Sequence, residues 1–188
     1  PGVYAANYPA HKQGAALRAQ LSLHNWNTPL QSHIYNIEAN QNKAHVATLS
    51  ATNNDVYADK KTFNTITINV TDESDNPLRN HQVTFKNEKG SAEFVEPTQQ
   101  NTDAHGVATI NMISQVAEEN TISATLPNGS TQRVTAKFVS DSNTPKLKQL
   151  VAAPDTISAG NSQGSTLIAT VTDFHNNPLK DMKVNFVA

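Results

Sequence analysis

The chain has 188 residues, a length that suits one or two domains, and it is 37 % hydrophobic but only 16 % charged. Asn, Thr, Ser and Gln fill the deficit in charge; Thr favours strands, whereas Asn and Ser favour turns. The formal net charge of −2 and the absence of cysteine exclude a basic nucleic-acid-binding surface, a disulfide framework and a thiolate metal site. No apolar run approaches ~20 residues, so no helix is expected to insert into a membrane. The composition predicts an all-β protein with many turns.

Residues 1–44 contain two strand candidates joined by a loop. Residues 16–23 alternate, with Leu and Ala on one face, and residues 32–37 form the second candidate. Trp26 and Pro29 lie in the loop between them. Two interpretations stay open here: the segment is the end of a preceding β domain, or it is an N-terminal β segment.

Residues 45–141 contain the strands of a complete domain. Residues 65–70 alternate strictly, which places Ile66, Ile68 and Val70 on one inward face. Further strands are predicted at 82–85, 107–114, 121–126 and 132–139. About seven strands in roughly 95 residues is the count expected of an immunoglobulin-like (Ig-like) β-sandwich.

Three turns separate these strands. Asp75-Asn76-Pro77 is a turn signal, because Pro fixes φ and Asn tolerates turn conformations. Residues 101–106 form a second turn, in which Gly106 can supply a positive φ. Residues 127–130 contain Asn-Gly, which predicts a hairpin with a type I′ turn.

An internal repeat fixes the organisation of the chain. The stretch from Val70 to Leu78, VTDESDNPL, returns 101 residues later from Val171 to Leu179 as VTDFHNNPL. The match continues in register, because Phe85 corresponds to Phe186. A period near 100 residues is the size of one Ig-like sandwich, so the fold class is all-β with tandem Ig-like domains.

The repeat gives a map of four parts. Residues 1–44 precede a complete Ig-like domain at 45–141, a short polar linker follows at 142–147, and residues 148–188 form the first half of a second domain that reaches its third strand. Half a sandwich cannot bury its own apolar face. Either the second domain is truncated, or another segment, including residues 1–44, completes it.

The repeated turn resembles a known family. The residues Val70-Thr71-Asp72, Asn76-Pro77-Leu78 and Val83-Thr84-Phe85, followed by TDAHGVA at 102–108, are similar to the bacterial Ig-like group 1 repeat of intimin- and invasin-type adhesins. Asp75 stands where the family usually has Gly, as does Asn176 in the second copy. The resemblance covers residues 45–188.

The resemblance implies a setting and a role. It implies a non-enzymatic adhesin component on the surface of a Gram-negative bacterium, or secreted by it, whose Ig-like domains act as a stalk or spacer. In this family receptor binding belongs mainly to a terminal tip domain. The alternative is a binding module that recognises a host receptor or a partner Ig-like protein.

The polar residues do not form a convincing catalytic or metal site. The carboxylates at 72–75 could hold calcium, but a solvated polar turn is preferred, with Asp72 accepting N–H bonds. His24 and His33 flank Trp26, yet no histidine pair has a zinc-site spacing. A Gly-x-Ser-x-Gly nucleophile turn and a phosphate-binding loop are both absent. No enzyme activity, metal or cofactor is therefore expected.

The candidate partner-binding residues are the aromatics Tyr4, Tyr8, Trp26 and Tyr35, all in the N-terminal segment. Aromatic side chains are enriched at binding hot spots. The alternative, which is preferred, is that Trp26 and Tyr35 are core of a preceding domain and that Tyr4 and Tyr8 cap its edge. Exposed strand edges offer a second route, to a protein partner or to self-association, because they carry unpaired N–H and C=O groups.

Overall fold

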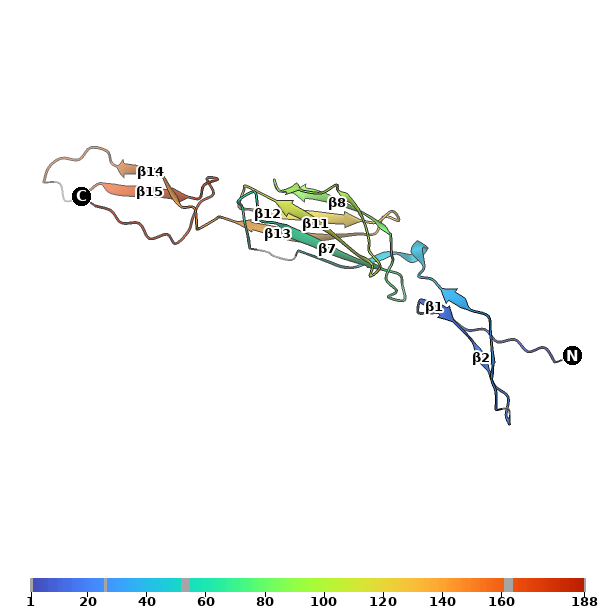
Figure 1. Cartoon of the computed structure of the whole chain (residues 1–188). Helices are drawn as coiled ribbons and strands as arrows, with labels where there is room; N and C mark the ends of the chain where they lie inside the picture. Colours follow the sequence, from blue (N-terminus) through green and yellow to red (C-terminus); the bar gives the residue numbers. More distant parts are fainter. Residues whose placement is uncertain (1, 26, 52–54, 161–163, 188) are drawn as a thin grey trace.

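The computed structural model describes residues 2–25, 27–51, 55–160 and 164–187. They form an elongated molecule with three successive parts, an N-terminal hairpin, a central β-sandwich and a C-terminal strand pair, with the chain ends at opposite ends of the molecule (Figure 1). No helix in the described ranges is long and apolar enough to cross a membrane. The 3-10 turn η1, Gln41–Lys43, leads into the sandwich.

The central domain is a sandwich of two sheets. One sheet has the strand order β10-β8-β12-β13-β6, and the other has the order β5-β7-β11-β9. The first sheet contains β6 (Val56–Tyr57), β8 (Gln82–Lys89), β10 (Gln99–Asn101), β12 (Glu119–Thr125) and β13 (Thr131–Val139). The second contains β5 (His45–Ala51), β7 (Asn64–Thr71), β9 (Glu93–Phe94) and β11 (Val107–Ile113). The described part of this domain has nine strands where about seven were expected, because β6, β9 and β10 are short edge strands that carry little apolar periodicity.

The core lies between the two sheets and follows the alternation in the sequence. Ile66, Ile68 and Val70 of β7 are fully buried, as expected from their spacing. The other fully or almost fully buried large side chains come from both sheets and their connections: Leu78, Val83, Phe85, Ile110, Met112, Ile122, Leu126 and Phe138. The strands expected at 107–114 and 121–126 likewise bury alternate side chains: Ala108, Ile110 and Met112 in the first, and Ile122, Ala124 and Leu126 in the second. A closed apolar core of this kind stabilises a domain of this size on its own.

The hairpin at 127–130 is present, but the type I′ assignment is wrong. Among the described non-glycine residues, Asn128 is not one with positive φ, whereas Gly129 has φ +86°. Leu126 N–H donates to Ser130 O at 2.8 Å, and Gly129 N–H donates to Leu126 O at 2.9 Å. Pro127 explains the difference: a two-residue loop would need an N–H donor at this position, and proline has none.

The two strand candidates of residues 1–44 pair with each other as an interrupted hairpin. β1 (Gly14–Leu17) pairs with β4 (Tyr35–Ile37), and β2 (Gln20–Leu21) pairs with β3 (Leu30–Gln31), both antiparallel. The continuous strand expected at 16–23 is not formed, because the strand is interrupted at residues 18–19 and ends at Leu21. Within β1, Ala16 has a positive φ of 54°. The register shift between Gly14 and Leu17 marks the same irregularity.

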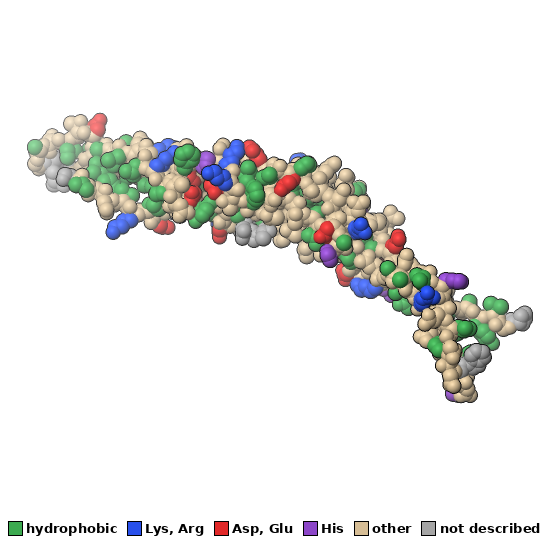
Figure 2. All heavy atoms as spheres, viewed as in Figure 1, with side chains coloured by type: hydrophobic (Ala, Val, Ile, Leu, Met, Phe, Trp, Pro, Cys, Tyr) green, Lys and Arg blue, Asp and Glu red, His purple; other side chains and the backbone are tan. Residues whose placement is uncertain are grey.

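The C-terminal part is a two-stranded antiparallel sheet of β14 (Lys146–Ala153) and β15 (Thr166–Thr172). The third strand expected near 183–186 is not formed in the described residues. Its equivalent in the central domain, β8, pairs with both β10 and β12, and no described segment offers such neighbours to residues 183–186. Hydrophobic side chains gather over this end of the molecule (Figure 2).

Candidate functional site

The aromatic candidates do not form one cluster. Tyr4 and Tyr8 are 95 % and 76 % exposed, and Tyr35 on β4 is 38 % exposed. Trp26 lies outside the described residues. Within the described ranges no ring–ring contact joins these tyrosines. Partner binding through this segment therefore stays a prediction.

The repeated acidic turn is the most organised polar feature of the molecule. Asp72 lies at the end of β7, and Asp75 has a positive φ of 58°, which turns the chain back toward Leu78. Leu78 N–H donates to Val70 O at 3.0 Å, so the two sides of the turn continue the sheet pairing. The second copy repeats this geometry, with φ +70° at Asn176 and a bond from Leu179 N–H to Val171 O at 3.1 Å.

The carboxylate of Asp72 is buried and accepts several N–H groups of its own turn. Oδ1 accepts from Ser74 N–H at 2.9 Å and from Asn76 N–H at 3.0 Å. The Asn76 amide Nδ2 donates to both oxygens, at 3.1 and 3.0 Å. The expectation that Asp72 accepts turn N–H groups is confirmed, but the solvated turn is wrong for this side chain, which is 3 % exposed.

These donors keep the buried carboxylate ionised. Burial by itself raises the pKa of Asp72, and the hydrogen bonds from Asn40 N–H and from the side chain and backbone of Asn76 lower it, to a net value of about 2. The pKa of Asp173 is lowered by the same balance, in which burial opposes bonds from Asn177 and Asp141. Each turn therefore places a fixed negative charge at the end of its repeat that contacts the preceding part of the chain.

Asn76 reaches out of its own turn into the N-terminal segment. Its Nδ2 donates to His11 O at 3.0 Å, and its Oδ1 accepts from Gln13 N–H at 2.9 Å. The carboxylate Oδ2 of Asp72 accepts from Asn40 N–H at 2.9 Å, just before the chain enters the sandwich. These three bonds define the first junction, between the N-terminal hairpin and the central domain.

Asn177 makes the same contacts at the other end of the central domain. Its Nδ2 donates to Gln115 O at 3.0 Å, and its Oδ1 accepts from Ala117 N–H at 2.8 Å. Oδ2 of Asp173 accepts from Asp141 N–H at 3.1 Å. These bonds define the second junction, between the central domain and the C-terminal strand pair.

The two junctions are thus built from equivalent atoms, even though the loops that they hold differ in sequence. Asn76 binds His11 and Gln13, whereas Asn177 binds Gln115 and Ala117. Both Asn side chains are buried, with exposed fractions of 5 % and 6 %. The four sequence positions of the Asp–Asn pairs are related by the 101-residue period.

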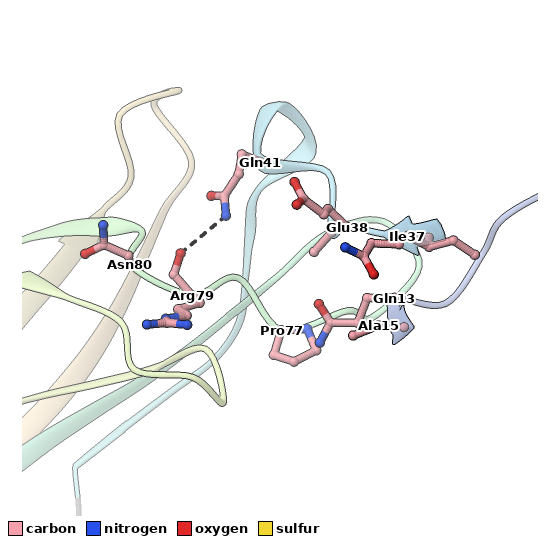
Figure 3. A pocket seen from close by; sticks show the side chains of 11 residues that line it. Gln13, Ala15, Ile37, Glu38, Gln41, Pro77, Arg79 and Asn80 are labelled. Atoms are coloured by element: carbon pink, nitrogen blue, oxygen red, sulfur yellow. Dashed lines mark hydrogen bonds between the residues drawn. The ribbon is translucent and has the colours of Figure 1, made fainter. Parts of the chain in front are cut away.

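A groove follows the first junction on its outer side. It lies between the N-terminal hairpin, which contributes Gln13, Ala15 and Ile37, and the turn of the central domain, which contributes Pro77 and Arg79 (Figure 3). Gln41 Nε2 donates to Arg79 O at 3.3 Å and bridges the two parts. The lining combines small and apolar residues with long polar side chains, and its described residues supply no convergent set of acid, base and nucleophile.

The turn does not have the donor set of a calcium site. Calcium needs 6–8 oxygen ligands, and the Asp72 oxygens already face N–H groups. Within the described part of the chain, no group of three or more His, Cys, Asp or Glu side chains could hold a metal ion.

Sequence reasoning treated Asn76 as a turn former and missed its role at the junction. The available signal was the repeat itself, because Asp72 and Asn76 both recur as Asp173 and Asn177. A turn alone does not require a particular Asn side chain after the Asp. The contact with a segment more than 60 residues away is visible only in the tertiary structure.

Comparison with known proteins identifies a long adhesin as a relative. The chain is 40 % identical over 186 residues to the inverse autotransporter adhesin YeeJ of Escherichia coli (strain K12). This alignment covers 98 % of the chain and 8 % of that protein, so the chain spans a small part of its relative's length. This relative is an adhesin, in agreement with the family that the sequence resembles.

Two solved structures are similar to this chain. Invasin, a bacterial integrin-binding protein, aligns with a TM-score of 0.54 and 18 % identity over 87 % of this chain and 33 % of its own. A C-terminal fragment of intimin in complex with the intimin-binding domain of the translocated intimin receptor aligns less well, with a TM-score of 0.47 and 17 % identity over 67 % of this chain and 46 % of its own. The expected tandem Ig-like fold is confirmed by the invasin likeness.

The family itself is shown by the central domain. Residues 46–139, half of the chain, match the bacterial Ig-like domain (group 1). This match covers the strands from β5 to β13 and includes the first Asp–Asn turn, whereas the second turn lies beyond it. The chain therefore belongs to the bacterial Ig-like domain (group 1) family.

Proposed function

We propose that this chain is a stalk segment of a surface adhesin of a Gram-negative bacterium, and that its Ig-like domains hold a distal binding region away from the outer membrane. The observation that carries the proposal is the pair of equivalent junctions. Each has three hydrogen bonds with buried Asp and Asn side chains. A hydrogen bond contributes about 1 kcal/mol, and bonds to a charged group contribute more. Such junctions favour one orientation of successive domains over a flexible chain.

The same junctions support a proposal for the N-terminal segment as the end of a preceding Ig-like domain. Gly14, directly after the bonded Gln13, pairs with Ile37. In the central domain Glu118, directly after the bonded Ala117, accepts from Phe138 N–H at 2.9 Å. Asn40, which donates to Asp72, lies three positions after Ile37. Asp141, which donates to Asp173, lies three positions after Phe138. The N-terminal hairpin thus occupies the place that β12 and β13 occupy in the central domain.

Small-angle X-ray scattering on the purified chain tests the stalk. We expect a rod-like particle whose length stays constant when the ionic strength is raised, because the junction contacts are buried. A compact particle, or a flexible one whose profile fits only an ensemble of bent conformers, would contradict the proposal. A mammalian-cell binding assay with the same chain should give no binding above the level of an unrelated Ig-like domain.

A second candidate function is a binding module, and the exposure of Tyr4 and Tyr8 favours it. Two tyrosines with open rings in a segment outside the sandwich are suited to contact a protein partner. Substituting both with Ser should then abolish capture of that partner while the melting temperature of the sandwich stays unchanged. Equal capture by the substituted chain would exclude this segment as the binding surface.

A further inference from the structure

The two asparagines hold loops that share no sequence. The first junction holds His11-Lys12-Gln13, and the second holds Gln115-Val116-Ala117. Asn76 and Asn177 nevertheless make the same two bonds, at 3.0 and 2.9 Å and at 3.0 and 2.8 Å. Every atom that the two asparagines contact in these loops belongs to the backbone. Lys12 Nζ of the first loop also donates to Ser74 O at 2.5 Å, but Val116, at the same place in the second loop, has no group that could make this bond.

The bonding pattern is that of a backbone peptide group. A carboxamide, like a peptide, carries a C=O acceptor and N–H donors. Each Asn donates to the carbonyl of one loop residue and accepts from the N–H two residues later, so its bonds flank the residue between them. One residue of a parallel β-strand flanks its neighbour in the same way. The Asn side chain therefore makes the two hydrogen bonds that one residue of a neighbouring parallel β-strand would make.

The paired Asp fixes which way the amide faces. A carboxylate only accepts hydrogen bonds, so the NH₂ end of each Asn must face its Asp. Asn76 Nδ2 lies 3.0 Å from Asp72 Oδ2, and Asn177 Nδ2 lies 2.8 Å from Asp173 Oδ2. The carbonyl end is thereby turned toward the loop N–H. The second N–H of the amide remains for the loop carbonyl.

We infer that the Asp–Asn pair in the turn of each repeat is a docking group that recognises the backbone of the preceding repeat's loop and requires no particular side chain in that loop. Its binding partner is the loop that leads into a hairpin of the preceding repeat. In the central domain this loop is residues 115–117, which lead into β12. The turn therefore couples successive repeats whatever the sequence of that loop. This inference rests on the proposed stalk function and adds the group that recognises each neighbour.

A distance measurement between spin labels tests it at the second junction. The chain has no cysteine, so Lys86→Cys and Gln149→Cys introduce two exposed labelling sites without background, one in the central domain and one on β14. In this labelled chain we expect a narrow distance distribution. A broad distribution here would overturn the stalk proposal itself, before any junction variant is compared.

Substitutions of Asn177 give the decisive comparison. Asn177→Ala removes both loop bonds, whereas Asn177→Asp removes the bond donated to Gln115 O and places a second carboxylate beside Asp173. We expect both variants to lose the narrow distribution. Asn76→Ala, at the other junction, should leave it intact and serves as the matched control. A narrow distribution that survives in both Asn177 variants would overturn the inference.

A loop exchange tests the independence from side chains. Gln115→His with Val116→Lys gives the second loop the exposed side chains of the first, while Ala117, which packs against the core, is kept. We expect the narrow distribution to remain. If the exchange broadens the distance distribution as much as Asn177→Ala does, the junction depends on the side chains of the loop and the inference is wrong. Thermal unfolding of each variant should show an unchanged transition for the central domain, which separates a loose junction from a misfolded domain.

Discussion

The central domain and the C-terminal strand pair carry the same repeat, yet they bury different parts of it. Ile66 is fully buried in the central domain, whereas its counterpart Leu167 is 49 % exposed. Phe85 is 2 % exposed and its counterpart Phe186 is 52 % exposed. The Asp–Asn turn does not follow this trend, since it is buried and hydrogen-bonded in both copies.

This difference separates two kinds of contact. Core positions need the second sheet of their own domain to be buried, and only the central domain has both sheets among the described residues. The junction turn needs only its local geometry and the loop of the neighbouring part. The two copies therefore differ in core burial but share the junction contact.

The largest effect should come from the core pair. Phe85→Ala in the central domain should cost about 3–5 kcal/mol of unfolding free energy, because a large buried side chain leaves a cavity. Phe186→Ala, at the equivalent repeat position, should cost less than about 0.5 kcal/mol, because its side chain is half exposed. Chemical denaturation of both variants measures the difference. Equal losses would show that the C-terminal copy has a closed core in solution.

A backbone substitution should follow in size. Gly106 has φ +75°, and a Cβ built there would lie 2.5 Å from Val70 O, so Gly106→Ala should cost about 3 kcal/mol. Gly129 has φ +86° but open space around it, so Gly129→Ala should cost only about 1 kcal/mol. Thermal melts of the two variants give the comparison. If Gly129→Ala is the more damaging of the two, the close approach to β7 does not determine the cost.

Acid should weaken the junctions by a smaller amount. The folded-state pKa of Asp72 lies at about 2, below its ordinary value of 3.8, so its contribution is complete above about pH 4 and disappears as the pH falls through about 2. The shift corresponds to about 2 kcal/mol. The lowered pKa of Asp173 predicts the same direction at the second junction.

Interdomain distances recorded along a pH titration would detect this loss. The labelled chain should keep its narrow distribution at neutral pH and lose it at the acid end. Asp173→Asn serves as the control, because its side chain does not titrate and its distribution should not change across this range. A wild-type distance distribution that stays narrow to the acid end of the titration would show that the carboxylate charge is not needed.

The smallest effect should come from a surface ion pair of the central domain. Arg133 and Glu88 form a two-pronged contact, with bonds at 2.6 and 3.1 Å, but the arginine side chain is 60 % exposed. Water and salt screen such pairs, so Arg133→Ala should leave the denaturation midpoint within experimental error. A clear loss of unfolding free energy would show that this ion pair, as well as core burial, stabilises the sandwich.

Much of the fold could be predicted from the chain alone. The alternation at 65–70 placed Ile66, Ile68 and Val70 in the core, because a strand with one buried face must alternate. The turn at 101–106 and the positive φ of Gly106 followed from residue type. The short edge strands β6, β9 and β10 were not predictable, because hydrogen bonds to a neighbouring strand define them, not a local pattern.

The sequence by itself determined the all-β class, the 101-residue repeat and the family, since these depend on periodicity and local turn chemistry. Only the tertiary structure decided what Asn76 and Asn177 do. Their partners lie about 60 residues earlier in the chain and are backbone atoms, which carry no residue identity. A contact to backbone leaves no complementary residue pattern in the sequence, so folding had to bring the loop and the turn together before the junction could be seen.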